Sequence, residues 1–147
     1  MKKIYLDVCT LCRPYDDQSY TRVHLETIAV QLILASVEKG LYSLIYSPVH
    51  EYEISSIEDD FERIDLLCFL SVAGKNVVND KQKVRKRAEM LVDFGLGIAD
   101  AAHVAYAETV NADFITCDDK LHRKCRSLAL DIWTGNPIVF CDKEALK

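Results

Sequence analysis

The stretch KIYLDV, residues 3–8, is the segment that decides the fold. It is apolar, rich in residues that favour β-structure and too short for a helix, so it predicts a buried strand. LIYS (44–47) and DFITCD (113–118) have the same character and are also flanked by polar residues. Continuous apolar runs of this kind are typical of parallel strands that are covered on both faces. We therefore expect at least three strands of a parallel sheet.

The segments between these strands have the pattern of helices. In TRVHLETIAVQLILASVEKG (21–40) the apolar residues recur at mostly helical spacing, and Lys39-Gly40 is a typical helix end. Ser47-Pro48 predicts an N-cap followed by proline at the first helical position. Further helices are expected at 59–74, at 81–95 with Asn79 or Asp80 as the cap, at 98–112 and at 121–128, and a last strand or two in LDIWT (130–134) and PIVF (137–140).

This alternation of strands and helices predicts an α/β protein, a three-layer α/β/α sandwich with a central, mostly parallel sheet. The chain has 147 residues, half of them hydrophobic, and we expect residues 1–147 to form a single domain. No apolar run approaches the roughly 18 residues that span a bilayer, so we expect a cytoplasmic protein without a membrane segment. The six cysteines lie mostly in apolar stretches, which fits a reducing compartment.

The charge distribution limits the class of protein. The net charge is −5, and residues 1–60 hold 10 acidic and 5 basic residues, whereas residues 61–147 hold 13 of each. This acidic excess argues against a protein that coats DNA with a broad basic face. It is compatible with a nuclease that binds its own cations.

Acidic residues follow the predicted strands, where an open parallel sheet collects its functional groups. Asp7 ends the first strand, Asp118 and Asp119 follow DFITC (113–117), and either Glu51 or Glu53 lies on the helix after the second strand. Asp100 opens the alanine-rich helix, where helix capping is its alternative role. Two charges ~5 Å apart at an effective dielectric of about 20 repel by roughly 3 kcal/mol, so such a cluster needs protons or a cation. Carboxylate oxygens favour Mg²⁺ or Mn²⁺ over Zn²⁺.

Five segments together resemble the PIN-domain nuclease family, in particular its VapC-like toxin branch in bacteria and archaea. The likeness covers essentially the whole chain, and its specificity lies in the ordered set rather than in any one fragment. The segments are IYLDVCTLCRPYDD (4–17), YSPVHEYEIS (46–55), GLGIADAAHVAYAE (95–108), ADFITCDDKL (112–121) and NPIVF (136–140).

The resemblance implies a divalent-metal-dependent endoribonuclease, usually a homodimer and often the toxin of a type II pair that is neutralised by an antitoxin encoded beside it. The acids of the family pattern fall on Asp7, Glu53, Asp100 and Asp118, which would hold Mg²⁺ or Mn²⁺ while a metal-activated water cleaves RNA. Glu53 resembles the family register more closely than Glu51, and residues two apart on a helix point about 200° apart.

Several other residues have expected roles near these acids. Arg13 is a candidate for holding the scissile phosphate, and the Thr116 hydroxyl would support the last acid and lie on the substrate side. Asp119 is expected to cap the helix that begins at Lys120. His103 shares a helix face with Asp100, so it either orients that carboxylate, touches substrate or is structural.

Two further features of the sequence leave alternatives open. The family commonly has a small polar residue or Asn after the first Asp, whereas this chain has Val8 and Cys9, which affects the hydrogen bonds expected there. KQKVRKR (81–87) is either a solvated helix face or an RNA-backbone contact beside the metal site.

Other protein classes explain less of the sequence. Cys9-Thr10-Leu11-Cys12 is a C-x-x-C that allows a glutaredoxin-like thiol oxidoreductase, but this needs a cis-proline loop, and Pro48 fits a helix start better. No second close Cys/His pair completes a zinc site, so we expect Cys9 and Cys12 to pack beneath the first loop. A receiver domain is disfavoured because the first strand ends in a single acid. A non-catalytic PIN-like module that binds RNA or protein remains the alternative to an enzyme.

Overall fold

The computed structural model describes residues 1–77 and 80–147. In this part of the chain, five strands form one sheet in the order β3-β2-β1-β4-β5, and every neighbouring pair is parallel. The strands are β1 (Lys2–Leu6), β2 (Tyr42–Tyr46), β3 (Gly74–Asn76), β4 (Asp113–Ile115) and β5 (Thr134–Gly135). The three predicted strands are confirmed, and they form the centre of the sheet.

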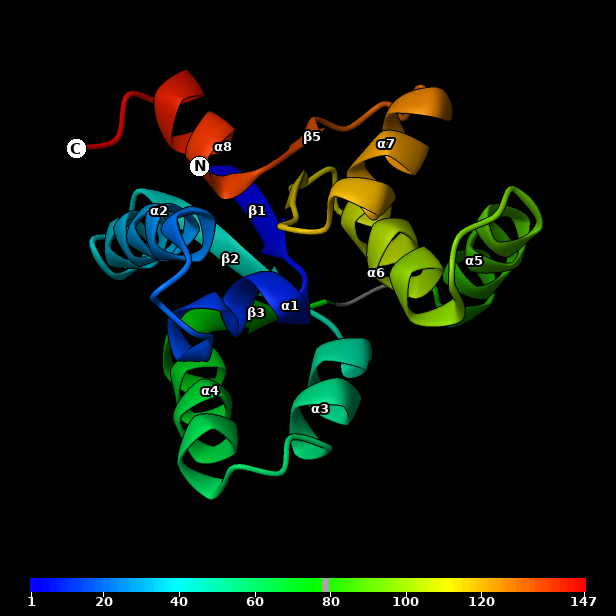
Figure 1. Ribbon diagram of the computed structural model, residues 1–147. Coiled ribbons are helices and arrows are strands. Elements are labelled where there is room, and N and C mark those ends of the chain that lie inside the picture. The colour runs from blue at the N-terminus through cyan, green and yellow to red at the C-terminus, as the bar shows by residue number, and fades with distance from the viewer. Residues whose placement is uncertain (78–79) are drawn as a thin grey trace.

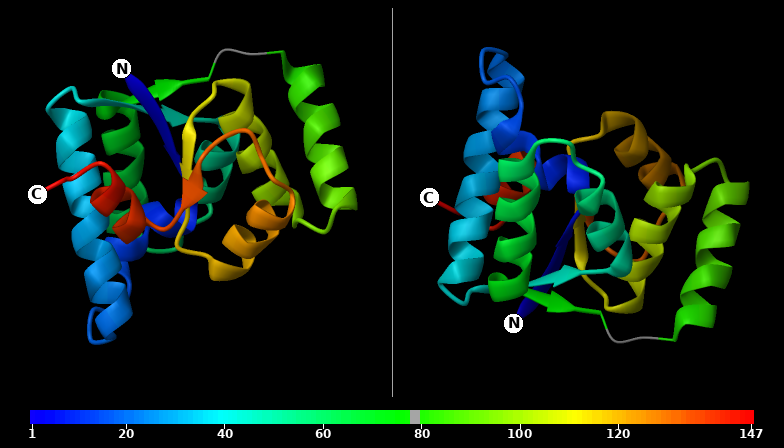
Figure 2. Two further views of the ribbon diagram at one scale, coloured as in Figure 1. Left: turned by 90° about the horizontal axis from the view of Figure 1, so that it is seen from above. Right: turned by 90° about the horizontal axis from the view of Figure 1, so that it is seen from below.

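Helices cover both faces of this sheet, which confirms the three-layer α/β/α fold (Figure 1). Helices α2, α4 and α8 lie on one side and α5, α6 and α7 on the other (Figure 2). The helices of the described chain are α1 (Val8–Leu11), the 3-10 turn η1 (Arg13–Tyr15), α2 (Thr21–Glu38), α3 (Pro48–Ser55), α4 (Asp60–Ala73), α5 (Lys81–Asp93), α6 (Ile98–Thr109), α7 (Asp119–Ser127) and α8 (Pro137–Lys143).

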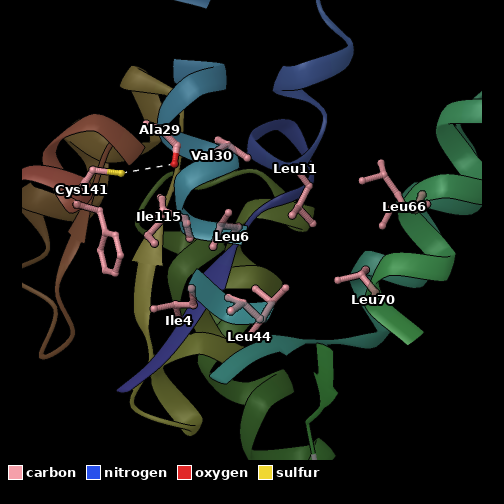
Figure 3. Packing of buried hydrophobic residues seen from close by; sticks show 14 residues of the cluster. Ile4, Leu6, Leu11, Ala29, Val30, Leu44, Leu66, Leu70, Ile115 and Cys141 are labelled. Carbon is pink, nitrogen blue, oxygen red and sulfur yellow. Dashed lines mark hydrogen bonds between the residues drawn. The ribbon is translucent and has the colours of Figure 1, made fainter. Parts of the chain in front are cut away.

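The side chains of β1 alternate between two hydrophobic cores, as the two-residue period of a strand requires. Ile4 and Leu6 point into the core beneath α2, α4 and α8, and both are fully buried. Figure 3 shows this core, with the thiol of Cys141 on α8 donating to the carbonyl of Ala29 on α2 at 3.4 Å. Tyr5 belongs to the opposite core, so burial on both faces explains why the run has no polar alternation.

The second core is built around the small residues of α6. Ala101, Ala105 and Ala107 are fully buried against strand residues such as Phe114, together with the apolar faces of α5 and α7. Because alanine has no side chain beyond Cβ, α6 approaches the sheet closely and brings its own polar residues near the strand ends. The first turn of α6 is thereby placed beside the carboxyl ends of β1 and β4.

One predicted strand is a helix in the structure, and one strand, β3, was not predicted. PIVF is not a strand but the start of α8, because Asn136 accepts a hydrogen bond from the Ile138 amide and Pro137 occupies the first turn. The edge strand β3 follows α4 without a loop, and a Cβ on Gly74 would lie 2.7 Å from the Leu70 carbonyl oxygen. Only glycine fits this approach, so the chain can pass directly from the last turn of α4 into the sheet.

The predicted cap of the helix at 81–95 is Asp80, whose carboxylate accepts from the amides of Gln82 and Lys83. Asn79, the alternative cap, lies outside the described residues. None of the helices in residues 1–77 and 80–147 combines the length and apolarity needed to cross a bilayer.

Candidate functional site

Asp7 lies at the carboxyl end of the central strand, where β1 leads directly into α1 (Figure 1). It is the N-cap of α1, and its carboxylate accepts a hydrogen bond from the Thr10 amide at 3.3 Å. Its exposed fraction is only 4%. A buried carboxylate of this kind is costly unless its oxygens are hydrogen bonded.

Two threonine hydroxyls satisfy the oxygens of Asp7. The Thr10 hydroxyl donates to Oδ1, and the Thr116 hydroxyl donates to Oδ2 at 2.6 Å. Each hydroxyl also accepts a backbone amide of the β4–α7 segment, Thr10 from Cys117 at 2.9 Å and Thr116 from Asp118 at 3.1 Å. Because the amides occupy the acceptor side, each hydroxyl proton is directed at the carboxylate.

Burial raises the pKa of Asp7, and the hydrogen bonds from Thr10 and Thr116 oppose this rise. Thr116 supports the last acid, as expected, because its hydroxyl accepts the Asp118 amide, and it also holds the first acid, Asp7. It is itself 1% exposed, so it does not offer a surface to substrate. Sequence reasoning missed Thr10, although its position three residues after a capping aspartate is the signal that would have found it.

Glu53 lies on α3, which follows β2, and its carboxylate accepts from Nε2 of His103 on α6. His103 is 2% exposed, whereas the Glu53 side chain is 34% exposed, so the carboxylate extends from a buried support toward solvent. Glu51 is exposed and has no contact with this cluster in the described structure. Of the alternatives left open for His103, orientation of Asp100 is not seen, because its Nε2 contacts Glu53.

Asp100 is the third residue of α6 and is partly buried. Within the described residues its carboxylate accepts no hydrogen bond, and the cap position is Gly97, so helix capping is not its role. Burial raises the pKa of the Asp100 carboxyl, and the negative charges of Asp7 and Asp118 raise it further. Carboxylates from three separate segments thus affect one another's ionisation near the carboxyl ends of the strands.

Asp118 is the exposed member of the set. Its Oδ1 accepts the amides of Lys120 at 3.0 Å and Leu121 at 3.1 Å, which makes Asp118, and not Asp119, the cap of α7. Asp119 is the first residue of that helix and forms a two-pronged ion pair with Arg22 of α2, at 2.5 and 2.6 Å. The expected capping role of Asp119 is therefore wrong.

Arg13 is bound within a partly buried ionic network on the α2 side of the site. Its Nε and Nη2 donate to Oε1 of Glu26 at 3.1 and 2.8 Å, and its Nη1 donates to Asp16 at 3.1 Å. Glu26 is fully buried, and its second oxygen accepts from the Asn136 amide group at 2.7 Å. These contacts argue against the expected role of Arg13 in holding a phosphate. Sequence reasoning missed Glu26, whose signal is a carboxylate within an apolar helix.

The thiols do not form a redox site. The Cys9 side chain is exposed and donates to Asp7 Oδ1 at 3.3 Å, whereas Cys12 packs against the core, so only Cys12 fits the predicted packing role. Although Cys9 is exposed as a residue, partial burial of its thiol against Asp7 and the Asp7 charge raise its pKa, and burial raises the pKa of Cys12 to about 12, so neither is the thiolate that exchange chemistry needs. All peptide bonds of the described chain are trans, which excludes the cis-proline loop of a glutaredoxin-like protein there.

The basic run at 81–87 does not lie beside the acids. Arg87 donates to Glu108 near the end of α6, at 2.9 Å, and Arg85 pairs with Glu89 of its own helix. Glu108 is eight residues after Asp100, which is about 12 Å along the helix axis. Of the two alternatives, the position of this run fits a solvated, partly neutralised helix face and argues against an RNA contact beside the metal site.

The site has the donor chemistry of a hard metal ion but not a closed coordination sphere. In residues 1–77 and 80–147, no three His, Cys, Asp or Glu side chains are already grouped closely enough to hold a metal ion. In the same residues, Asp7, Asp100 and Asp118 form no ion pair with Lys or Arg. Oxygen donors with uncompensated negative charge fit Mg²⁺ or Mn²⁺, which retain waters and need few direct protein ligands.

Taken together, the parallel sheet and the acids at the carboxyl ends of its strands define an α/β domain with a candidate metal-binding site. Residues 4–127 match the PIN domain family, so this chain belongs to that family. PIN domains are generally nucleases, and PIN-domain nucleases use divalent metal ions.

A comparison with solved structures gives the same fold. The crystal structure of FitAcB from Neisseria gonorrhoeae is similar over 91% of this chain and 97% of that chain, with a TM-score of 0.55. Sequence identity is 15%, so this likeness shows the fold alone. No protein of curated function matches the sequence.

Proposed function

We propose that this protein is an Mg²⁺- or Mn²⁺-dependent endoribonuclease that hydrolyses RNA phosphodiester bonds. The observation that carries the proposal is the set of four acids, Asp7, Glu53, Asp100 and Asp118, at one edge of the sheet of a PIN domain, without Lys or Arg partners in the described chain. When bound, the cation would make a water acidic enough to attack phosphorus and would stabilise the developing charge.

Each of the four acids is positioned differently for holding that cation. Asp7 is fixed by Thr10 and Thr116 at the buried floor of the site, and Glu53 is directed by His103. Asp118 uses Oδ1 for the cap of α7, which leaves Oδ2 for a ligand. Asp100 offers a carboxylate without a hydrogen bond in the described structure, so it is the acid whose environment a cation would improve most.

Cleavage of a mixed RNA with Mn²⁺ tests the proposal. The wild type is compared with Asp100→Asn and with Asp93→Asn, a matched change at an exposed residue at the end of α5. We expect Mn²⁺-dependent cleavage by the wild type and the control, and loss of at least about a hundredfold in Asp100→Asn with its fold retained. Equal cleavage by all three proteins would indicate a contaminating nuclease and refute the assignment.

A partner protein is a second part of the proposal. We propose that the enzyme is a cytoplasmic homodimer and the toxin of a type II pair, based on its membership of the PIN family and its resemblance to the VapC-like branch. Co-expression with the neighbouring reading frame tests this, because a cognate antitoxin would co-purify and suppress cleavage. Failure of every neighbouring product to bind would refute the toxin–antitoxin part and leave the nuclease part standing.

One observation favours the non-catalytic alternative, a PIN domain that binds RNA or protein without cutting. As the described side chains stand, the acids do not form a ready metal-binding group. Mn²⁺ titration of the wild type by calorimetry distinguishes the two functions. Tight RNA binding without Mn²⁺ binding or cleavage would support the binding module instead of the enzyme.

A further inference from the structure

A buried row of polar side chains connects the centre of the sheet to Glu53. The Tyr5 hydroxyl lies 2.6 Å from Nδ1 of His103 and 2.7 Å from Oγ of Ser47. His103 then contacts Glu53 through its other ring nitrogen, Nε2. Three elements, β1, the start of α3 and α6, thus meet at residues that are each 2% exposed or less and end at one partly exposed carboxylate.

The donor in each of these hydrogen bonds can be assigned by starting from Glu53, at one end of the row. An ionised carboxylate only accepts, so Nε2 of His103 donates to Glu53, and in a neutral imidazole Nδ1 must then accept from the Tyr5 hydroxyl. Because the Tyr5 hydroxyl proton is used on His103, the Ser47 hydroxyl must be the donor in its contact with the Tyr5 oxygen. The protons therefore point from Ser47 through Tyr5 and His103 to Glu53.

The rings in this row also fix one another in space. The centroids of Tyr5 and His103 are 5.5 Å apart in an edge contact, and those of His50 and His103 are 4.8 Å apart. His50 is held by the Ser47 amide on Nδ1 at 3.0 Å and by the Leu6 carbonyl on Nε2 at 2.6 Å. His103 consequently has one tautomer and one ring orientation available.

We propose that Tyr5 and His103 are positioning residues that hold Glu53 in the geometry of a metal ligand, with Tyr5 acting only through His103. This inference rests on the proposed function, because it explains why Tyr5 and His103 support Glu53, one of the proposed metal ligands. Groups that orient a metal ligand in this way typically change metal affinity 10- to 100-fold when they are removed. Tyr5 does not contact Glu53, so its effect must pass through the imidazole.

The test is Mn²⁺ binding by calorimetry to wild type, Tyr5→Phe, Glu53→Gln and the double variant. Tyr42→Phe is the matched control, because it removes a hydroxyl that donates to the carboxylate of Glu144 at 3.0 Å, away from this row. We expect Tyr5→Phe to weaken Mn²⁺ binding by about tenfold or more, with wild-type affinity in Tyr42→Phe. In the Glu53→Gln background, Tyr5→Phe should change affinity by less than about twofold.

Each outcome of this cycle has a separate meaning. Wild-type affinity in folded Tyr5→Phe, or an equal loss in both backgrounds, would overturn the positioning role while leaving the metal site intact. Absence of Mn²⁺ binding by the wild type would instead refute the proposed metal site itself. Nitrogen NMR of the wild type, labelled at histidine, gives a test without any variant, since we expect the His103 proton on Nε2. A proton on Nδ1 alone would contradict the assignment of donors and acceptors in this row.

Discussion

Thr10 and Thr116 hold the same carboxylate from opposite sides of the site. Their hydroxyls donate to the two oxygens of Asp7, and each hydroxyl accepts one of two consecutive amides, those of Cys117 and Asp118. The β1–α1 and β4–α7 connections are therefore joined through one buried aspartate. The same contacts that keep Asp7 ionisable also fix the backbone that presents Asp118.

Thr116→Val should destabilise the protein and weaken metal binding together. The variant keeps the shape of the side chain but leaves Asp7 Oδ2 and the Asp118 amide without a partner, which costs about 1–3 kcal/mol of unfolding free energy. Urea denaturation measures this loss. Thr109→Val is the control, because its hydroxyl donates within α6 to Ala105, and we expect it to cost about 0.5 kcal/mol or less. Equal losses in the two variants would show that the hydrogen bonds of Thr116 contribute no more to the unfolding free energy than that of an ordinary helix hydroxyl.

Asp100→Asn should separate metal binding from folding. Because burial and the charges of Asp7 and Asp118 raise the pKa of Asp100, its ionised form is disfavoured in the metal-free fold, and the neutral amide relieves that repulsion. We expect the metal-free variant to unfold at the wild-type temperature or above. Mn²⁺ should raise the unfolding temperature of the wild type and of Asp93→Asn, but not that of Asp100→Asn. The prediction fails if Mn²⁺ stabilises all three equally.

His50 should make the protein less stable in mild acid. Burial and the neighbouring His103 lower the pKa of His50 to about 3, whereas in the unfolded chain it titrates near its ordinary value of 6.5. Between these values the unfolded state binds the extra proton, so the free energy of unfolding falls as the pH falls below 6.5. The contribution of this residue reaches about 1.4 kcal/mol per pH unit.

Urea unfolding at several pH values between about 7 and 5 checks this slope. Replacing His50 by Gln removes the titrating group, so the pH dependence should become shallower even though the variant is less stable overall. His24→Gln, at an exposed histidine of α2, should retain the wild-type slope. An unchanged slope in His50→Gln would assign the acid sensitivity to other groups.

Glu26→Gln should cost about 3 kcal/mol of unfolding free energy. The change leaves the Arg13 guanidinium beside a neutral amide, and removing one partner of a buried ion pair is strongly destabilising. Thermal or urea unfolding against Glu38→Gln, an exposed change at the end of the same helix, measures the difference. A loss no larger than that of the control would mean that Arg13 is satisfied by Asp16 and solvent.

The sequence by itself determined the layers of the fold and indicated which acids are candidates for the site. Short apolar runs such as KIYLDV specify strands that are buried on both faces. Adjacent residues such as Ile4 and Tyr5 point into different cores, so both must be apolar. Local signals also gave the start of α3 at Ser47 and the cap of α5 at Asp80. These features depend on neighbours within a few residues, so they can be recognised without the rest of the chain.

Only the tertiary structure decided which side chains support those acids. The partners of Asp7 and Glu53, namely Thr116 and His103, are 109 and 50 residues away in the chain, and no local pattern encodes such a contact. The same holds for Arg13, which sequence position placed near a phosphate and folding placed on Glu26. Hydrogen bonds and ion pairs act over a few ångströms in space, so their partners are set by how the sheet and helices pack.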